Sequence, residues 1–468
     1  MWKACKIAAT SLLLGMSTAS AQPALDLPTA LNLALTQNRD LAQRARSVGS
    51  AELSLASARA DFGFSLRPDG GAQTTDDRDS YSYGLALGKK FLLGTEVSAG
   101  PRIQWSETDD DSNTRTSWQV DLRQPLFRNF GALVQGEALI LANQRIRSAQ
   151  RDYELQKASL LLRVVEMFES LIRLDRKIAS DDASLQRLDK LYRLTRARER
   201  QGRATRVDTL RVELRLGEAK SRLETSREQL SSQQRDFAEL LGQSPDTRYT
   251  LEPPPLLDLK PMPPTEAVRV ALSNRLDYAQ AIQDYKDTER GEKIARRGLL
   301  PDLNVVARYE SYDNSSDTYT GTRKGDLWSV GIGGDTDLNQ SHERARLGQA
   351  ILSRESAVES VRIRELAITR EVQQQTTAYR RAMDEMRIAE RNHQLALQRA
   401  KLARRLFEIG RGDNFSVTDA EEALTDAEDR RLSSRAEASV AGYNYLNTLG
   451  TLLEAPAVLR PNLSEVPP

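Results

Sequence analysis

The spacing of apolar residues predicts long amphipathic helices in two regions of the chain. Positions 137–201 and 349–409 contain neither Gly nor Pro, and their apolar residues recur three and four positions apart. At about 1.5 Å per residue, each region predicts a helix roughly 90 Å long. The repeated positions form a narrow seam that is typical of a coiled coil. The first seam consists of Leu171, Leu174, Ile178, Leu185, Leu188 and Tyr192, and the second of Ala382, Met386, Ala389, His393, Ala396, Ala400, Ala403 and Phe407.

The period of the pattern changes to two in the regions 62–124 and 303–334, which predicts β-strands. Large apolar side chains alternate there with small or polar ones, as in a barrel with lipid outside and water inside. A soluble sandwich with one buried face would alternate in the same way. In the barrel reading, aromatic residues lie at the membrane interface. The candidates are Tyr81, Tyr83, Trp105, Trp118, Tyr309 and Trp328.

The number of strands predicts an oligomer. Four to six strands per chain cannot close a membrane-spanning barrel, because the smallest such barrels have about eight. An open edge is not stable in lipid, since its backbone groups stay unpaired. If the strands lie in a membrane, several copies of the chain must share one barrel.

An internal duplication divides the chain into two halves. The Pro-Thr opening of the helix at 27–38, which closes on Asn38, recurs at 263–274 and closes on Asn274. Helical patterns resume after Gly202 and Gly410, so each glycine is expected to mark the turn of a helix hairpin. We expect a first repeat at 22–252, a Pro-rich linker at 253–263, a second repeat at 264–455 and a tail at 456–468. Asn38 lies 164 positions before Gly202 and Asn274 only 136 before Gly410, which predicts a longer or additional strand hairpin in the first half.

The N-terminus predicts export. Lys3 and Lys6 precede an apolar stretch, and a small-residue site ends at Ala21, which together are typical of a cleavable signal peptide at 1–21. Cys5 lies before the apolar stretch rather than at the cleavage point, so lipidation of a cysteine is not expected.

Composition excludes several kinds of chemistry. Lys and Arg total 67 against 66 for Asp and Glu, so no basic excess points to nucleic acid. The chain has two histidines, His342 and His393, and one cysteine. Zinc sites built from Cys and His, disulfide frameworks and Cys–His nucleophiles are therefore excluded. We predict no catalytic residues, no cofactor and no metal site, and hence no enzyme.

The ordered motifs resemble those of the TolC-like outer-membrane efflux protein family over about residues 25–455. The matching features are the repeated opening, the two glycine turns, the closing Leu241-Gly242 and Leu449-Gly450 pairs, Leu300-Pro301-Asp302-Leu303 before a strand, and Gln124-Pro125-Leu126-Phe127 after one.

This resemblance implies a mainly α-helical fold with a small β part. Long antiparallel coiled-coil helices in two pseudo-repeats would each contribute β-hairpins to a barrel shared by a homotrimer, 12-stranded in the family. The barrel would contact outer-membrane lipid, and the helices would form a periplasmic tunnel. Its partners would be a periplasmic adaptor protein and an inner-membrane pump or ABC transporter, and the chain would be a passive exit channel for efflux or type I secretion.

The resemblance also implies that Gly202 and Gly410 are periplasmic tip turns with gating residues beside them. Asp208, six positions after Gly202, matches a gating aspartate, and Asp419, nine after Gly410, matches an aspartate of an acidic ring. Ser416 replaces the other ring aspartate. The remaining candidates at the entrance are Arg203, Arg206, Arg411 and Asp413.

The first turn is mainly basic and the second mainly acidic. We hypothesise that alternating tips attract one another around the ring and hold the entrance shut. The alternative is that these charges lie on solvated helix faces and contribute little. For the whole chain, the alternative to a channel is a secreted fibrous coiled-coil scaffold without channel activity.

Overall fold

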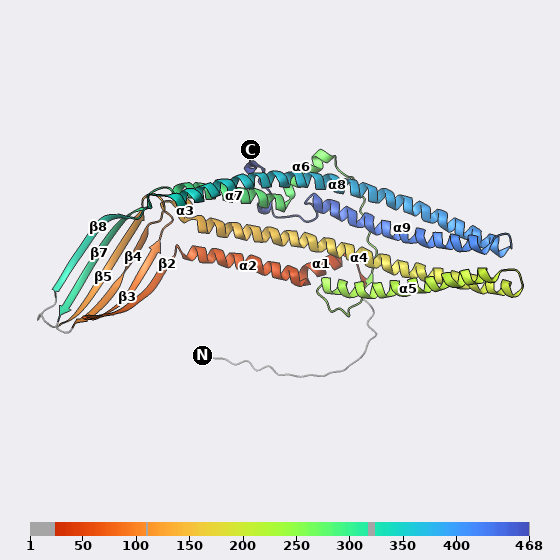
Figure 1. Cartoon of the computed structure of the whole chain (residues 1–468), viewed down its shortest axis with the longest axis horizontal. Coiled ribbons are helices and arrows are strands. Elements are labelled where there is room, and N and C mark those ends of the chain that lie inside the picture. Colours follow the sequence, from red (N-terminus) through yellow and green to blue (C-terminus); the bar gives the residue numbers. More distant parts are fainter. Residues whose placement is uncertain (1–23, 109–110, 317–322, 468) are drawn as a thin grey trace, which may run out of the picture. The chain divides into compact units, whose positions relative to one another are not determined.

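The computed structural model describes residues 24–108, 111–316 and 323–467. The predicted signal peptide lies outside these residues, as do Asp109 and Asp110 between two of the strands. The first half contains β1 (Ala24–Leu25), α1 (Leu27–Gln37), α2 (Arg39–Ala60), β2 (Phe64–Thr75), β3 (Arg78–Lys90), β4 (Glu96–Thr108), β5 (Asp111–Pro125), α3 (Ala132–Gln135), α4 (Glu137–Arg200), α5 (Arg206–Leu240) and β6 (Thr250–Leu251). The second half contains α6 (Pro264–Asn274), α7 (Leu276–Arg297), β7 (Leu303–Ser316), β8 (Arg323–Gly334), α8 (Ser341–Glu408), α9 (Asn414–Thr448) and the short 3₁₀ turns η1 (Ala457–Leu459) and η2 (Leu463–Glu465) (Figure 1).

The chain divides into two compact units. The first takes residues up to Asn38, together with 160–258 and 381–440. The second takes 39–159, 259–380 and the residues from Ala441 onward. In the described residues, the regular structure of unit 1 is helical apart from the parallel pair of β1 and β6, and unit 2 contains the large sheet.

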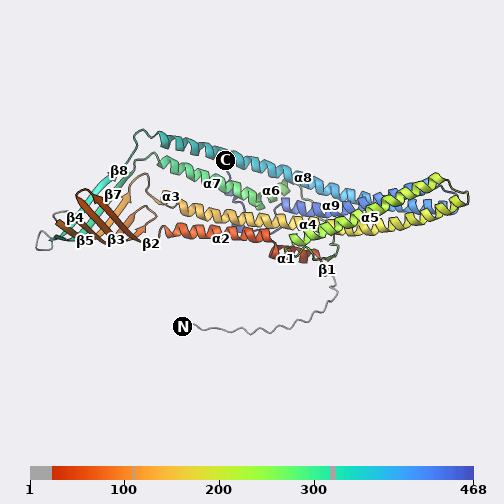
Figure 2. The same ribbon diagram turned by 60° about the horizontal axis from the view of Figure 1, so that its bottom comes forward.

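In unit 1, α4 runs beside α5, and α8 runs beside α9 (Figures 1 and 2). Leu191, Val212, Phe407 and Val417, one from each of these four helices, form a single buried cluster. Large apolar side chains removed from water in this way contribute about 1.5–3 kcal/mol each. The two helix hairpins are therefore packed together within one chain.

The seams are more polar than the apolar pattern predicts. Ile178 and Leu185, which the pattern places in the first seam, are only partly buried. Asp181 and Ser184 between them are each only 2% exposed. These polar groups can be buried because each has a hydrogen-bond partner on another helix, Ser226 for Asp181 and Thr425 for Ser184. The apolar pattern therefore identified the helix but missed part of its buried face.

The glycines of the two closing Leu-Gly pairs, Gly242 and Gly450, lie so close to another segment of the chain that a side chain would not fit. Gly242 has φ +77°, and a Cβ there would lie 2.3 Å from the carbonyl oxygen of Gln37, next to the Asn38 that ends the repeated opening. In unit 2, Gly450 has φ +69° and lies in the same way against Asn274. The opening and closing motifs of each half thus form one contact between helix ends.

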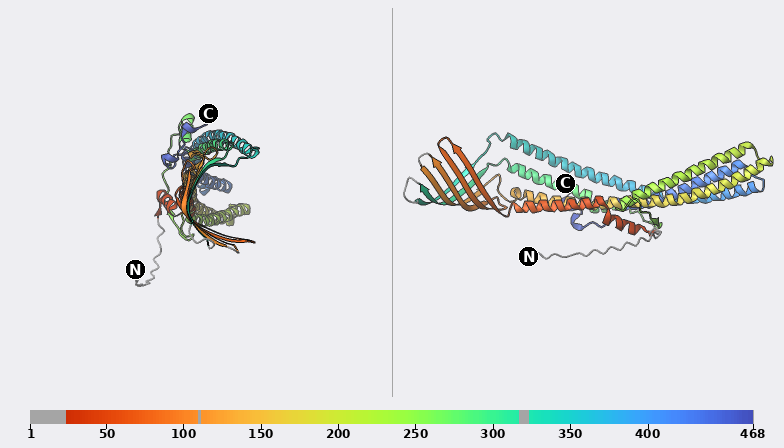
Figure 3. Two further views of the ribbon diagram at one scale, coloured as in Figure 1. Left: turned by 90° about the vertical axis from the view of Figure 1, so that its left-hand side faces the viewer. Right: turned by 90° about the horizontal axis from the view of Figure 1, so that it is seen from below.

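Unit 2 contains an open antiparallel sheet in the order β2-β3-β4-β5-β7-β8. The strands lie side by side in a curved layer (Figure 3). The first half supplies two hairpins and the second half one, so the excess of residues in the first half is an additional hairpin. The four strands per chain implied by the 12-stranded family barrel are therefore wrong for this chain, which has six in the described part of its sheet.

Within the described ranges, no helix has the length and apolar character required to cross a membrane.

Candidate functional site

The six aromatic residues singled out in the sequence lie on one face of the sheet. Residues opposite each other in an antiparallel register share a face, and the register pairs Tyr81 with Trp105 and Tyr309 with Trp328. The rings of Tyr81 and Trp105 are stacked, with centroids 5.2 Å apart. Trp328 is 77% exposed in the single chain. This face therefore presents large aromatic side chains to its surroundings.

Aliphatic side chains extend the same face. Leu85, Leu87, Ile103, Val330 and Ile332 are all exposed on it. A continuous apolar surface of this size on one chain marks contact with a membrane or with another protein.

The opposite face of the sheet is polar and carries ion pairs across the strands. Asp69 of β2 reaches Arg102 of β4 at 2.7 Å, and both side chains lie across β3. They pass over Gly84, where a Cβ would be 2.4 Å from the Asp69 carboxylate. Two further pairs join β5 to β7, Arg308–Asp121 at 2.6 Å and Arg115–Glu310 at 3.0 Å.

The sheet has two open edges. β2 pairs only with β3, and β8 only with β7, in the part of the chain that the structure describes. Because six antiparallel strands alternate in direction, β2 and β8 run in opposite directions. Identical copies can therefore join edge to edge in the antiparallel manner.

The turn at Gly202 is closed by a helix-ending motif. The Gly202 N–H donates to the Glu199 carbonyl at 2.9 Å, and the Arg203 N–H donates to the Arg198 carbonyl at 2.8 Å. Gly202 has φ +70°, a conformation that glycine adopts without strain. Thr205 and Asp208 then form a reciprocal capping box at the start of α5. These hydrogen bonds lower the pKa of Asp208, so this carboxylate is ionised and caps the helix.

The turn at Gly410 is built in the same way, but its capping carboxylate stands at a different position. Gly410 has φ +77°. Asp413 accepts a hydrogen bond from the Ser416 N–H at 2.8 Å, and hydrogen bonding to Ser416 lowers the pKa of Asp413. The carboxylate lies six positions after the glycine in the first turn but three positions after it in the second. This swap explains why serine stands where the family pattern has a second aspartate.

The remaining entrance candidates are exposed, except Asp419, which is only partly exposed. Arg206 lies 3.7 Å from Glu199, and Asp419 pairs with Arg399 of its own hairpin. Arg203 and Arg411 are exposed at the two turns. The structure therefore brings the candidates to the ends of the two hairpins of unit 1, and the two turns touch, since the Asn414 side-chain amide donates to the Asp208 carbonyl at 3.1 Å.

Sequence reasoning missed a buried charge cluster that joins the hairpins. Glu421 of α9 is 3% exposed and accepts from Arg187 Nε of α4 at 2.7 Å. Arg404 Nε of α8 lies 3.0 Å from the same carboxylate. A buried glutamate and an exposed one cannot be told apart from the sequence of a highly charged helix. No local signal therefore distinguished Glu421 from its neighbour Glu422.

A second missed contact joins Glu169 of α4 to Ser439 of α9. The Ser439 hydroxyl donates to the Glu169 carboxyl at 2.5 Å, and both residues are almost fully buried. Burial raises the pKa of Glu169, while Ser439, Arg435 and Arg176 act in the opposite direction.

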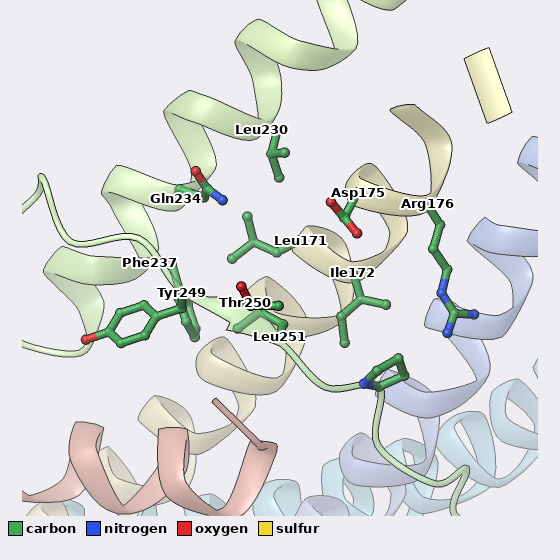
Figure 4. A pocket seen from close by; sticks show the side chains of 11 residues that line it. Leu171, Ile172, Asp175, Arg176, Leu230, Gln234, Phe237, Tyr249, Thr250 and Leu251 are labelled. Atoms are coloured by element: carbon green, nitrogen blue, oxygen red, sulfur yellow. The ribbon is translucent and has the colours of Figure 1, made fainter. Parts of the chain in front are cut away.

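Unit 1 also contains a small pocket between α4, α5 and β6. Figure 4 shows Leu171 and Ile172 of α4 lining it with Leu230 and Phe237 of α5 and with Tyr249. Its volume of about 130 Å³ is below the 300–1,000 Å³ of usual small-molecule sites. Among the described residues, no group of three or more His, Cys, Asp or Glu side chains is placed to hold a metal ion.

Solved structures with the same fold are outer-membrane proteins. The outer-membrane channel OprN matches with a TM-score of 0.70 and 18% sequence identity, over 91% of this chain and 90% of its own. The outer membrane protein VceC from Vibrio cholerae matches with a TM-score of 0.69 and 16% sequence identity, over 91% of this chain and 96% of its own. The CmeC outer membrane channel from Campylobacter jejuni matches with a TM-score of 0.70 and 13% sequence identity, over 92% of this chain and 86% of its own. A comparison with curated protein sequences finds no match.

The open sheet with one apolar and one polar face, together with the paired helix hairpins, defines the class of fold: that of the outer-membrane channels. The model of the family described as outer membrane efflux protein matches residues 267–447 of this chain. The resemblance to the TolC-like outer-membrane efflux proteins is thus confirmed, by the family match in the second half and by the fold along nine-tenths of the chain.

Proposed function

We propose that this chain is one subunit of a trimeric channel that gives passive exit across the periplasm and the outer membrane, for a tripartite efflux or type I secretion system. The observation that carries this proposal is the open sheet, which exposes an apolar face and, within the described ranges, has two unpaired edges. Such a sheet is stable in lipid only if other copies complete it. Three copies with six strands each would supply an 18-stranded barrel, and barrels of 16–18 strands enclose an aqueous channel.

We also propose that the two halves are repeats of one plan. Helices α1 and α6 have 11 residues each, α2 and α7 have 22, and α5 and α9 have 35. These equal lengths support a duplication in which the halves differ mainly by one strand hairpin.

The molecular mass in detergent and the conductance test the channel. We expect the protein extracted from outer membranes to have three times the mass of one chain and to conduct ions in planar bilayers. A monomer that stays soluble without detergent would favour the alternative, a secreted fibrous scaffold.

The two glycine turns are proposed as the periplasmic tips. Three-fold rings near Asp419 would form the constriction, and the basic and acidic turns of neighbouring copies would attract one another. Reversing the charges of Arg203 and Arg206 together should raise the conductance of the closed channel. An unchanged conductance would assign these arginines to solvated helix faces.

The proposed partners are a periplasmic adaptor protein and an inner-membrane pump or ABC transporter. The match to the family described as outer membrane efflux protein supports a role in efflux, and the resemblance to TolC-like proteins implies these partners. Co-purification of the tagged channel from its native host, followed by identification of the bound proteins, tests the assignment. Recovery of the channel without an adaptor after mild cross-linking would contradict it.

A further inference from the structure

The polar face of the sheet carries more positive than negative charge. Four of its carboxylates are engaged in ion pairs on that face, so each cancels one cation. The pairs are Asp69–Arg102, Asp121–Arg308, Glu310–Arg115 and Glu96–Lys90, at 2.6 to 3.8 Å. The strand registers place all eight residues on the same face.

Four cations of this face remain, against one carboxylate. The register places Arg67, Arg78, Arg123 and Arg323 on the polar face, together with Asp111. The excess is therefore three positive charges per chain within the described strands. Arg67 and Arg123 are exposed, and no carboxylate among the described residues lies within ion-pair distance of either.

We propose that this face makes the exit pore selective for anions, so that the cargo that crosses the barrel most readily is negatively charged. The inference rests on the proposed function, in which the apolar face contacts lipid and the polar face lines the water-filled lumen. An arginine on the lipid side would be strongly unfavourable at the middle of the bilayer. The arginines therefore belong to the lumen.

The structure keeps this charge at the wall without narrowing the lumen. Glycines lie beside the largest polar side chains of this face. A Cβ at Gly88 would lie 3.1 Å from the Arg67 guanidinium, and a Cβ at Gly325 would lie 2.7 Å from the Tyr312 hydroxyl. The long side chains consequently lie flat across neighbouring strands.

The field of this wall comes mainly from the excess arginines. Opposite charges within about 4 Å of each other largely cancel at a distance, whereas an uncompensated charge acts over about 10 Å at 0.1 M salt. Three copies would add nine positive charges around the pore, whereas Asp419 at the proposed constriction is compensated by Arg399 of its own chain. Rings of Arg and Lys are a general means of selecting anions and phosphate compounds in pores.

The reversal potential in planar bilayers under a KCl gradient tests the inference. The wild-type channel should favour chloride over potassium, and less strongly as the salt concentration rises. The double variant Arg67→Gln/Arg123→Gln, which lowers the excess from three to one per chain, should reduce the chloride-to-potassium permeability ratio about twofold or more. The reversal Arg67→Glu/Arg123→Glu should shift it further in the same direction.

The matched control removes one charge of each sign. Asp69→Asn/Arg102→Gln also changes two side chains of the polar face but leaves the excess at three, so its permeability ratio should equal that of the wild type. The inference is overturned if the channel conducts and all four proteins have the same reversal potential. If none of them conducts, although each is recovered as a membrane-inserted protein, the proposed channel function fails first, and this inference with it.

Discussion

Gly242 at the end of α5 is required for two separate reasons, and only one of them can be predicted from the local sequence. The left-handed φ of Gly242 ends the helix, which a Leu-Gly pair before a proline predicts. Its second task is to admit the carbonyl of Gln37, which is more than 200 residues away in the chain. The same pair of tasks recurs at Gly450.

We predict that Gly242→Ala destabilises the protein by about 2–4 kcal/mol, because an L-residue in the left-handed region costs about 1–2 kcal/mol and the new methyl group meets the Gln37 carbonyl. Thermal unfolding followed by circular dichroism measures the effect. The control is Gly217→Ala within α5, where a Cβ meets nothing within 4 Å. That substitution should stabilise by about 0.5–1 kcal/mol. Equal effects of the two substitutions would show that neither the left-handed backbone of Gly242 nor its contact with Gln37 matters for stability.

At the scale of the helices, the two hairpins of unit 1 are joined by buried polar groups as well as by apolar clusters. The sequence predicted helices with apolar seams, and the buried leucines and alanines agree with it. It could not predict that Glu421, Arg187 and Arg404 meet, because their partners lie on three helices and their residue types are abundant on every exposed face.

The Glu421 cluster should contribute to stability more than a neighbouring exposed pair does. Glu421→Gln removes the charge between two arginines and should cost about 3 kcal/mol, since breaking a buried pair leaves its partners uncompensated. Glu422→Gln affects a pair with Arg215 whose side chains are 43% and 36% exposed, and should cost less than about 1 kcal/mol. Unfolding in guanidinium chloride, measured on both variants in parallel, gives the comparison. A larger loss for Glu422→Gln would refute the assignment.

The contact between Glu169 and Ser439 should make stability depend on pH. Burial raises the pKa of Glu169 in the folded protein above its unfolded value, so the folded state binds the proton more tightly. The contribution of this group to stability is therefore largest at acidic pH and is lost as the pH rises through the folded pKa. Glu169→Gln should raise the melting temperature at neutral pH, have little effect below the unfolded pKa, and flatten the pH dependence between the two. A lower melting temperature of Glu169→Gln at neutral pH would show that Arg176 and Arg435 outweigh burial.

For the whole molecule, the decisive property is that the sheet, in the residues that the structure describes, has two different faces and two open edges. The alternation of side chains predicted the faces, and the count of strands predicted that one chain cannot form a barrel. The number of strands came from the tertiary structure, since whether an extra segment lengthens one hairpin or adds another depends on how the strands pair.

Substitutions on adjacent residues of β8 distinguish the two faces. Val330→Arg places a charge on the apolar face and should reduce the stability of the membrane-inserted protein by about 2–4 kcal/mol, whereas Ser329→Arg places it on the polar face and should be tolerated. Folding into lipid vesicles at increasing urea measures both. Equal tolerance of the two arginines would mean that the apolar face does not contact lipid.

The sequence by itself determined the helices, their glycine turns, the strand regions and the two-faced character of the sheet. All of these follow from the period of neighbouring side chains and from the backbone freedom of a few residues, which act over one or two turns of chain. The tertiary structure alone decided which charges are buried, which carboxylate caps a helix, how the opening and closing motifs of each half meet, and that six strands form the described part of the sheet. These depend on contacts between residues far apart in the chain, whose free energy is set by packing and exclusion of water and is not encoded in any short segment.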